Sequence, residues 1–113
     1  MDGAQTTKAI RVHKYGGPDT LKLDEIPLSS PGPKEVLIRQ RAIGVNYADI
    51  HTRNGRYPLP SLPHVIGGEG AGVVEALGRD VDHLQIGDRV AYSSGGHALP
   101  RGSYTEARVL SAD

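Results

Sequence analysis

The sequence predicts a mainly β domain, and three features of its composition and spacing support that class. Fifteen glycines and eight prolines interrupt the 113-residue chain every few positions, as in a chain with many turns. Short segments rich in Val, Ile and Leu lie between them, and a single segment has the pattern of a helix. A chain of this length fits one domain with a modest core, in which we expect one or two short helices.

Six segments have the composition of strands. In the third of them, apolar and polar residues alternate only partly, because Arg39 and Arg41 interrupt the apolar series. This pattern predicts a bend, and a bent strand can cross between two sheets. The residues 94–97 are predicted to form a loop, in which we assign His97 no role. The predicted strands cover residues 8–13, 21–26, 36–45, 70–77, 89–93 and 104–109.

The predicted helix covers residues 47–53. Asn46 precedes it and is a residue type that caps helix N-termini, and Asn54-Gly55 follows it with a sequence suited to a left-handed end. The residues 57–63 contain three prolines, which prevent helix and disfavour an interior strand. We therefore expect these residues to run extended across the surface.

Charge and composition exclude several classes of function. Thirteen basic residues balance thirteen acidic ones, so we expect neither nucleic acid nor an anionic membrane as a partner. The absence of cysteine excludes a disulfide, a thiolate nucleophile and a Cys-rich zinc site. No apolar run has the length of a signal peptide core or a membrane span, and we expect a cytoplasmic protein.

Three ordered segments carry a resemblance to a known family. They are GVNYADIHTRNGRYP at 44–58, IGGEGAGVV at 66–74 and GDRV at 87–90. Their order and spacing resemble the medium-chain dehydrogenase/reductase superfamily, and residues 44–78 look most like its quinone oxidoreductases related to zeta-crystallin. The resemblance implies that residues 1–113 form the GroES-like catalytic domain, a partly open β-barrel. It also implies an NADPH-binding Rossmann domain outside this chain and a homodimer at full length.

The same resemblance implies that zinc is absent. Zinc alcohol dehydrogenases of this superfamily have Cys at the position of Asn46 and His at the position of Gly68. Neither an amide nor a glycine suits a site that prefers thiolate and imidazole ligands. Without this Lewis acid, the implied acceptor is one that spreads the incoming charge over its own π system, such as a quinone or an α,β-unsaturated ketone.

The first motif contains the candidate site residues. The resemblance implies that Asn46 lies beside the nicotinamide, where its amide donates to a bound carbonyl or orients the cofactor; helix capping is the alternative. Tyr47 and His51 complete the implied cofactor-binding set. The implied catalytic residues are Asn46, His51 and Tyr57.

His51 and Tyr57 are implied to supply proton and substrate chemistry. Many quinone oxidoreductases have Tyr at the position of His51, whereas zinc alcohol dehydrogenases often have a proton-relay His there. A histidine changes charge near neutral pH, so His51 can donate a proton through water, although Ala48 lacks the hydroxyl that would continue a relay. A half-buried surface histidine is the alternative. Tyr57 can stack on a quinone or anchor its loop against Pro58, and Arg53 is assigned to structure.

The glycines at 67–72 superficially match a dinucleotide fingerprint. Val73-Val74 follows them and predicts a strand, so no helix N-terminus is offered to a pyrophosphate. We expect these glycines to allow a tight bend, with Glu69 as a buried or pocket-edge carboxylate.

The resulting hypothesis is the substrate-side domain of an NADPH:quinone oxidoreductase, inactive without its cofactor domain. Two alternatives are an enoyl thioester or alkenal reductase of the same superfamily and a non-enzymatic GroES-like binding module.

Overall fold

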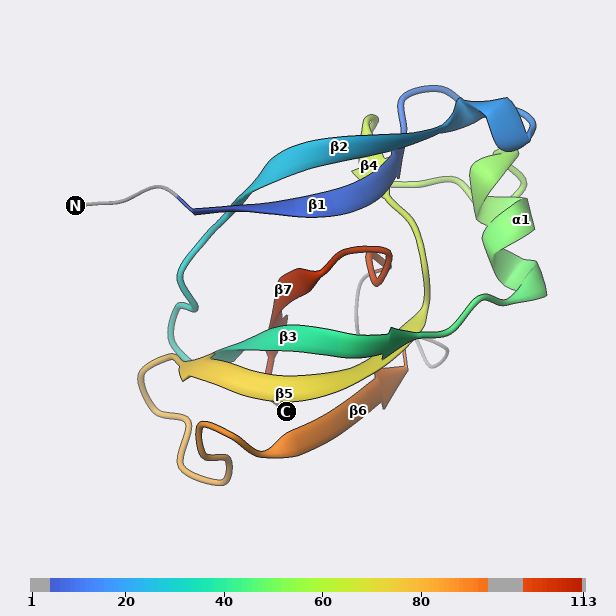
Figure 1. Cartoon of the computed structure of the whole chain (residues 1–113). Coiled ribbons are helices and arrows are strands. Elements are labelled where there is room, and N and C mark those ends of the chain that lie inside the picture. Colours follow the sequence, from blue (N-terminus) through green and yellow to red (C-terminus); the bar gives the residue numbers. More distant parts are fainter. Residues whose placement is uncertain (1–4, 94–100, 113) are drawn as a thin grey trace.

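Two antiparallel β-sheets form the chain, as Figure 1 shows for a computed structural model that describes residues 5–93 and 101–112. The smaller sheet has the strand order β2-β1-β4, and the larger has the order β6-β5-β3-β7. The sheets are not joined into a closed barrel, which confirms the predicted partly open, mainly β fold. The elements are β1 (Gln5–Val12), the 3-10 helix η1 (Pro18–Thr20), β2 (Leu21–Leu28), β3 (Glu35–Ile43), α1 (Tyr47–Arg53), β4 (His64–Val65), β5 (Glu69–Leu77), β6 (Arg89–Ser93) and β7 (Ala107–Ser111).

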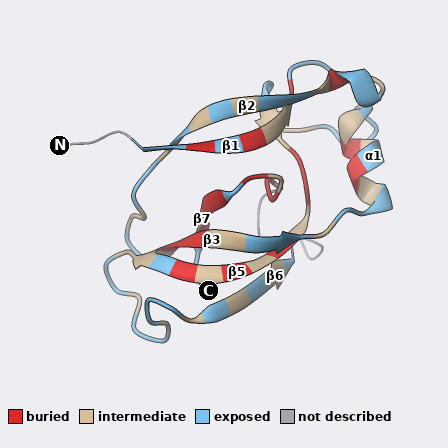
Figure 2. Cartoon of the chain, viewed as in Figure 1, coloured by how far each residue is buried: buried red, intermediate tan, exposed pale blue. Residues whose placement is uncertain are grey.

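Buried residues lie on strands of both sheets (Figure 2), and one core cluster consists of Val36, Ile38 and Leu110. The core as a whole consists of small and branched side chains, and burial of their apolar area is the main stabilising contribution to such a fold. No described helix is long and apolar enough to cross a membrane. The buried hydrophobic residues are Ala9, Val12, Val36, Leu37, Ile38, Ile66, Val74, Ala107 and Leu110.

The bend predicted in the third strand is present. The pairing of β3 with β5 changes register between Leu37 and Ile38 and again between Gln40 and Ala42. Such bulges bend a strand and increase its twist, which accounts for the incomplete alternation. However, β3 pairs with β5 and β7 in one sheet, so the expectation that it crosses between sheets is wrong.

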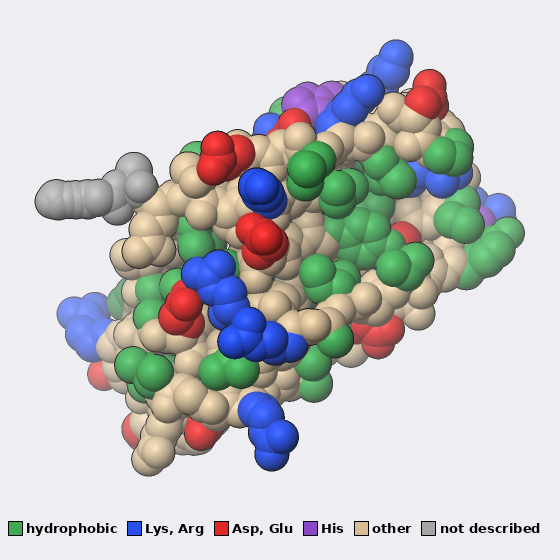
Figure 3. Space-filling view, viewed as in Figure 1, with side chains coloured by type: hydrophobic (Ala, Val, Ile, Leu, Met, Phe, Trp, Pro, Cys, Tyr) green, Lys and Arg blue, Asp and Glu red, His purple; other side chains and the backbone are tan. Residues whose placement is uncertain are grey.

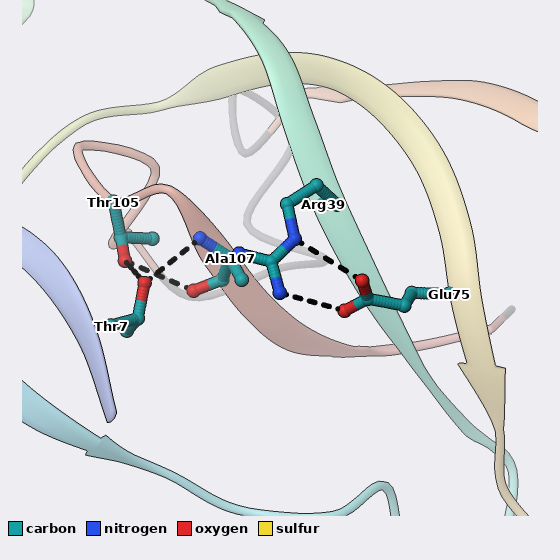
Figure 4. A network of polar contacts seen from close by, with 5 residues as sticks. All are labelled: Thr7, Arg39, Glu75, Thr105 and Ala107. Atoms are coloured by element: carbon teal, nitrogen blue, oxygen red, sulfur yellow. Dashed lines mark hydrogen bonds and ion pairs between the residues drawn. The ribbon is translucent and has the colours of Figure 1, made fainter. Parts of the chain in front are cut away.

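The segment before β7 makes that crossing instead. Tyr104 donates its backbone N–H to the Ile66 carbonyl, and its own carbonyl accepts from the Ile10 N–H of β1. The paired residues of β7 and β3 begin at Ala107, three residues after the predicted start. Figure 4 shows the side chains that support the crossing, where the Ala107 N–H donates to Thr7 Oγ1 and Thr105 Oγ1 donates to the Ala107 carbonyl.

The other predicted elements agree with the structure to different degrees. Helix α1 and strand β6 have the predicted bounds, whereas the two-residue β4 was not predicted. The segment 57–63 lies mostly on the surface as expected, but it bends rather than running straight, and its Leu62–Pro63 peptide bond is cis. The loop predicted at 94–97, with His97, lies outside the described residues.

Candidate functional site

Helix α1 begins and ends as its flanking residues predict. Asn46 is the N-cap, with extended backbone angles (φ −126°, ψ 156°), and its N–H donates to Asp49 Oδ2 at 3.0 Å. This is the reciprocal bond of a capping box. At the other end Gly55 has a φ of +88°, a left-handed conformation that glycine adopts without cost.

The side chain of Asn46 joins the helix to the start of β5. Its Nδ2 donates to Glu69 Oε2 at 2.8 Å, so the amide is oriented by a carboxylate. A Cβ atom at Gly44 would collide with the Glu69 side chain. The absence of a side chain at Gly44 therefore allows Glu69 to lie against the backbone beside Asn46.

Three aromatic side chains form a continuous row beside this polar pair. The His51 ring lies edge-on to both tyrosines, with centroids 5.3 Å from Tyr47 and 5.0 Å from Tyr57. Tyr57 is held there because its N–H donates to the His51 carbonyl at 3.0 Å. The ring atom Nδ1 of His51 is buried and has no hydrogen-bond partner among the described residues. We call Tyr47, His51 and Tyr57 the aromatic row.

The opposite side of α1 is tied to the crossing segment. Asp49 is 5% exposed, and its Oδ2 accepts a 2.6 Å hydrogen bond from the Tyr104 hydroxyl. Burial, and next the hydrogen bond to Asp49, raise the pKa of Tyr104 well above its ordinary value. The neutral hydroxyl is therefore the stable form, and it anchors the buried carboxylate.

Two apolar hollows open next to α1. One of about 320 Å³ is lined by Val45, Asn46, Tyr47, Ile50 and others. The second, of about 280 Å³, lies between β1 and the end of β3, and the two share Val45 and Tyr104. Figure 3 shows hydrophobic side chains gathered on this half of the molecule. Exposed apolar surface of this kind is typical of a ligand or domain contact.

Gly68 precedes Glu69 of the polar pair and has space at its side-chain position. A Cβ atom there would lie 3.9 Å from Nη1 of Arg101, whose Cζ is 5.9 Å from the Tyr57 ring centroid. Among residues 5–93 and 101–112, no three His, Asp or Glu side chains gather as a metal site would require.

The structure thus brings all four predicted site residues to one end of the molecule, while their roles stay predictions. Arg53 donates from Nε to the Gly16 carbonyl at 3.1 Å. Three residues near the site were not predicted: Asp49, Tyr104 and Arg101. The Asn46 to Asp49 spacing of a capping box could have indicated the first. The other two come from a distant part of the sequence, and no motif signals their contacts.

The fold and the site place the chain in the class of GroES-like β domains. The profile described as "Alcohol dehydrogenase GroES-like domain" matches residues 32–113, and the chain belongs to that family. This confirms the predicted membership of the medium-chain dehydrogenase/reductase superfamily.

Quinone oxidoreductases are among the proteins that this chain resembles. The chain is 46% identical over 106 residues to a quinone oxidoreductase of Pseudomonas aeruginosa, covering 94% of this chain and 31% of that protein. It matches the structure of Escherichia coli quinone oxidoreductase complexed with NADPH with a TM-score of 0.86 and 37% identity, over 93% of this chain and 31% of that one. A 2-haloacrylate reductase of a Burkholderia species is 39% identical over 109 residues, which are 93% of this chain and 31% of that protein. The chain therefore spans about a third of the length of these relatives.

Proposed function

We propose that this chain is the acceptor-binding part of an NADPH-dependent reductase that acts on quinones or conjugated enones without zinc. The observation that carries the proposal is the aromatic row beside the Asn46–Glu69 pair, in a chain 46% identical to a quinone oxidoreductase. The nicotinamide domain lies outside these 113 residues, so we expect the isolated chain to be inactive.

The residues at this end fit a nicotinamide ring and its carboxamide. Tyr47 is 74% exposed and Tyr57 is 44% exposed, so both offer aromatic surface. Asn46 uses one N–H on Glu69, and an amide has two to donate. When bound, NADPH supplies a hydride to the acceptor.

The side chains of this chain would bind and polarise the acceptor. A flat conjugated ring can stack on Tyr57, whose side chain is 44% exposed in this chain. The negative charge that develops on the acceptor oxygen needs a hydrogen-bond donor, which the Tyr57 hydroxyl or the His51 imidazole can supply. Because Ala48 has no hydroxyl, the proton reaches the product from one of these groups or from water.

The ligand chemistry supports a reaction without zinc. The position of a zinc-ligating Cys holds Asn46, whose amide is already bound to Glu69. The position of a zinc-ligating His holds Gly68, which has no side chain to coordinate a metal. A conjugated acceptor needs less Lewis acid assistance than an alcohol, because delocalisation within the acceptor stabilises its charge.

The test is NADPH oxidation by the complete protein that carries this domain. We expect turnover with 1,4-benzoquinone and with an α,β-unsaturated ketone, and unchanged rates after treatment with 1,10-phenanthroline. Tyr57→Ala should raise the quinone KM by about tenfold through loss of the stacking surface, while Tyr57→Phe should leave it within about twofold. Loss of activity with the chelator would contradict zinc independence, and equal effects of the two substitutions would contradict stacking.

A further inference from the structure

Arg101 lies next to Tyr57, a member of the aromatic row. Its guanidinium carbon is 5.9 Å from the Tyr57 ring centroid, and its Nη1 lies next to the empty side-chain position of Gly68. The guanidinium therefore lies near both Tyr57, the ring assigned to the acceptor, and Gly68, the residue that precedes Glu69.

The contacts of Arg101 within the protein are weak. A separation of 5.9 Å is near the outer limit of about 6 Å for a cation–π interaction, which contributes little at an exposed site. Among the described residues, no carboxylate forms an ion pair with Arg101, whereas Arg11 pairs with Asp24 and Arg39 with Glu75. The planar set of N–H donors on Arg101 is thus available to a ligand.

A second cation increases the positive potential around Arg101. Nη2 of Arg108 lies 3.3 Å from the position that a Cβ atom would take at Gly102, the next residue in the chain. Arg101 and Arg108 also line a hollow of about 360 Å³ between the two sheets. The carboxylate of Glu69 partly opposes this potential, and the hydrogen bond that it accepts from the neutral amide of Asn46 leaves its charge in place. Converging positive charges at a concave surface attract anions.

We propose that Arg101 is a specificity-determining residue that binds the anionic group of a conjugated acceptor. The proposal rests on the proposed function and defines its substrate class: acceptors that carry a carboxylate next to the conjugated double bond. A guanidinium binds a carboxylate through two parallel hydrogen bonds, and the conjugated part of the acceptor then lies beside Tyr57. Arg101 forms and breaks no covalent bond.

The test compares two probes of similar shape, 2-chloroacrylate and its neutral methyl ester. Binding is measured by calorimetry or by backbone amide chemical shifts, without NADPH, and KM is measured on the complete protein. We expect Arg101→Gln to weaken 2-chloroacrylate binding by about tenfold or more and to leave the ester within about twofold. Arg101→Lys keeps the charge but loses the two parallel hydrogen bonds, so its affinity for 2-chloroacrylate should lie between those of the wild type and Arg101→Gln.

The matched control is Arg79→Gln, which removes the same charge from an exposed residue beyond the opposite end of β5. It should affect neither probe. If Arg101→Gln weakens both probes equally, or if Arg79→Gln reproduces its effect, the proposal is wrong. Thermal unfolding of each variant establishes that the fold is kept.

A further arm separates the acceptor from the cofactor as the source of the anion. Inorganic pyrophosphate binding and the NADPH KM should not change in Arg101→Gln, and a loss in either that matches the loss for 2-chloroacrylate would overturn the proposal. If the complete protein oxidises NADPH with neither probe and with no quinone, the proposed function fails. A charge-selective loss of 2-chloroacrylate binding in Arg101→Gln would still support the anion site.

Discussion

The two sides of helix α1 are held in different ways. On the inner side, Asp49 and Thr52 are 5% and 0% exposed, and hydrogen bonds from Tyr104 and from the backbone of Asn46 converge on the Asp49 carboxylate. On the outer side, Tyr47 and His51 are held mainly by ring contacts. A seven-residue helix is not stable by itself, so the inner side supplies its anchor. The rings of Tyr47 and His51 on the outer side take no part in this anchor.

The largest effect should come from Gly67→Ala, which disturbs the inner anchor. Gly67 has a φ of +109°, and a Cβ atom there would collide with Ser103 and Tyr104. We expect the free energy of unfolding to fall by about 3 kcal/mol, through backbone strain plus overpacking, as measured by chemical denaturation. Gly87→Ala is the matched control, because Gly87 has a φ of +95° and no described atom within 4 Å of the added Cβ. Equal losses in the two variants would show that contact with Tyr104 contributes nothing.

Tyr104→Phe should have the next largest effect, since it removes the hydroxyl that donates to the buried Asp49 carboxylate. We expect a loss of about 2 kcal/mol, in the range for a hydrogen bond to a charged group. Tyr47→Phe is the control on the outer side, where 74% exposure predicts a change below about 0.5 kcal/mol. If the two variants are equally stable, the inner side of α1 is not the anchor.

The anchor should also weaken in alkali. The pKa of Tyr104 is raised in the folded protein, so above pH 10, the ordinary value for tyrosine, the folded state keeps a proton that the unfolded state loses. Stability from this group is complete below pH 10 and decreases as the pH rises further. The difference in unfolding free energy between wild type and Tyr104→Phe should therefore shrink above pH 10. A difference that stays constant would contradict this account.

A smaller effect is expected from Asn46, which connects the two sides. Asn46→Ala removes the N-cap and the partner of Glu69, for a loss of about 1 kcal/mol. Asn46→Asp retains a capping oxygen but places a second carboxylate beside Glu69. The repulsion raises the pKa of one of the two groups in the folded state, so this variant should regain stability relative to wild type as the pH falls. If the loss of stability in Asn46→Asp is the same at acidic and neutral pH, repulsion between the new carboxylate and Glu69 is not its cause.

The accuracy of each prediction from the sequence depends on how far apart in the chain the interacting residues lie. Helix α1 was predicted to the residue because Asn46 and Asn54-Gly55 are adjacent signals for its ends. Strand β7 begins later than predicted because the backbone partners of Tyr104 lie in β1 and at Ile66. The Tyr104–Asp49 contact joins residues 55 positions apart, and the contact of Arg101 with Tyr57 is also long-range. Family motifs identified Asn46, Tyr47, His51 and Tyr57, but no local pattern indicates which distant side chains surround them.

The smallest effect on stability should come from His51→Phe on the outer side. Phenylalanine keeps an aromatic ring between Tyr47 and Tyr57 and removes Nδ1, a buried nitrogen without a described partner. A buried polar atom that lacks a hydrogen bond destabilises the folded state, so its removal offsets the less exact fit of the new ring. We expect the unfolding free energies of His51→Phe and the wild type to agree within about 0.5 kcal/mol. If His51 donates a proton or a hydrogen bond to the acceptor, kcat of the complete protein should nevertheless fall by about tenfold to a hundredfold. A large loss of stability with unchanged kcat would mean that His51 belongs to the anchor, and that the two sides of α1 do not divide structure from chemistry.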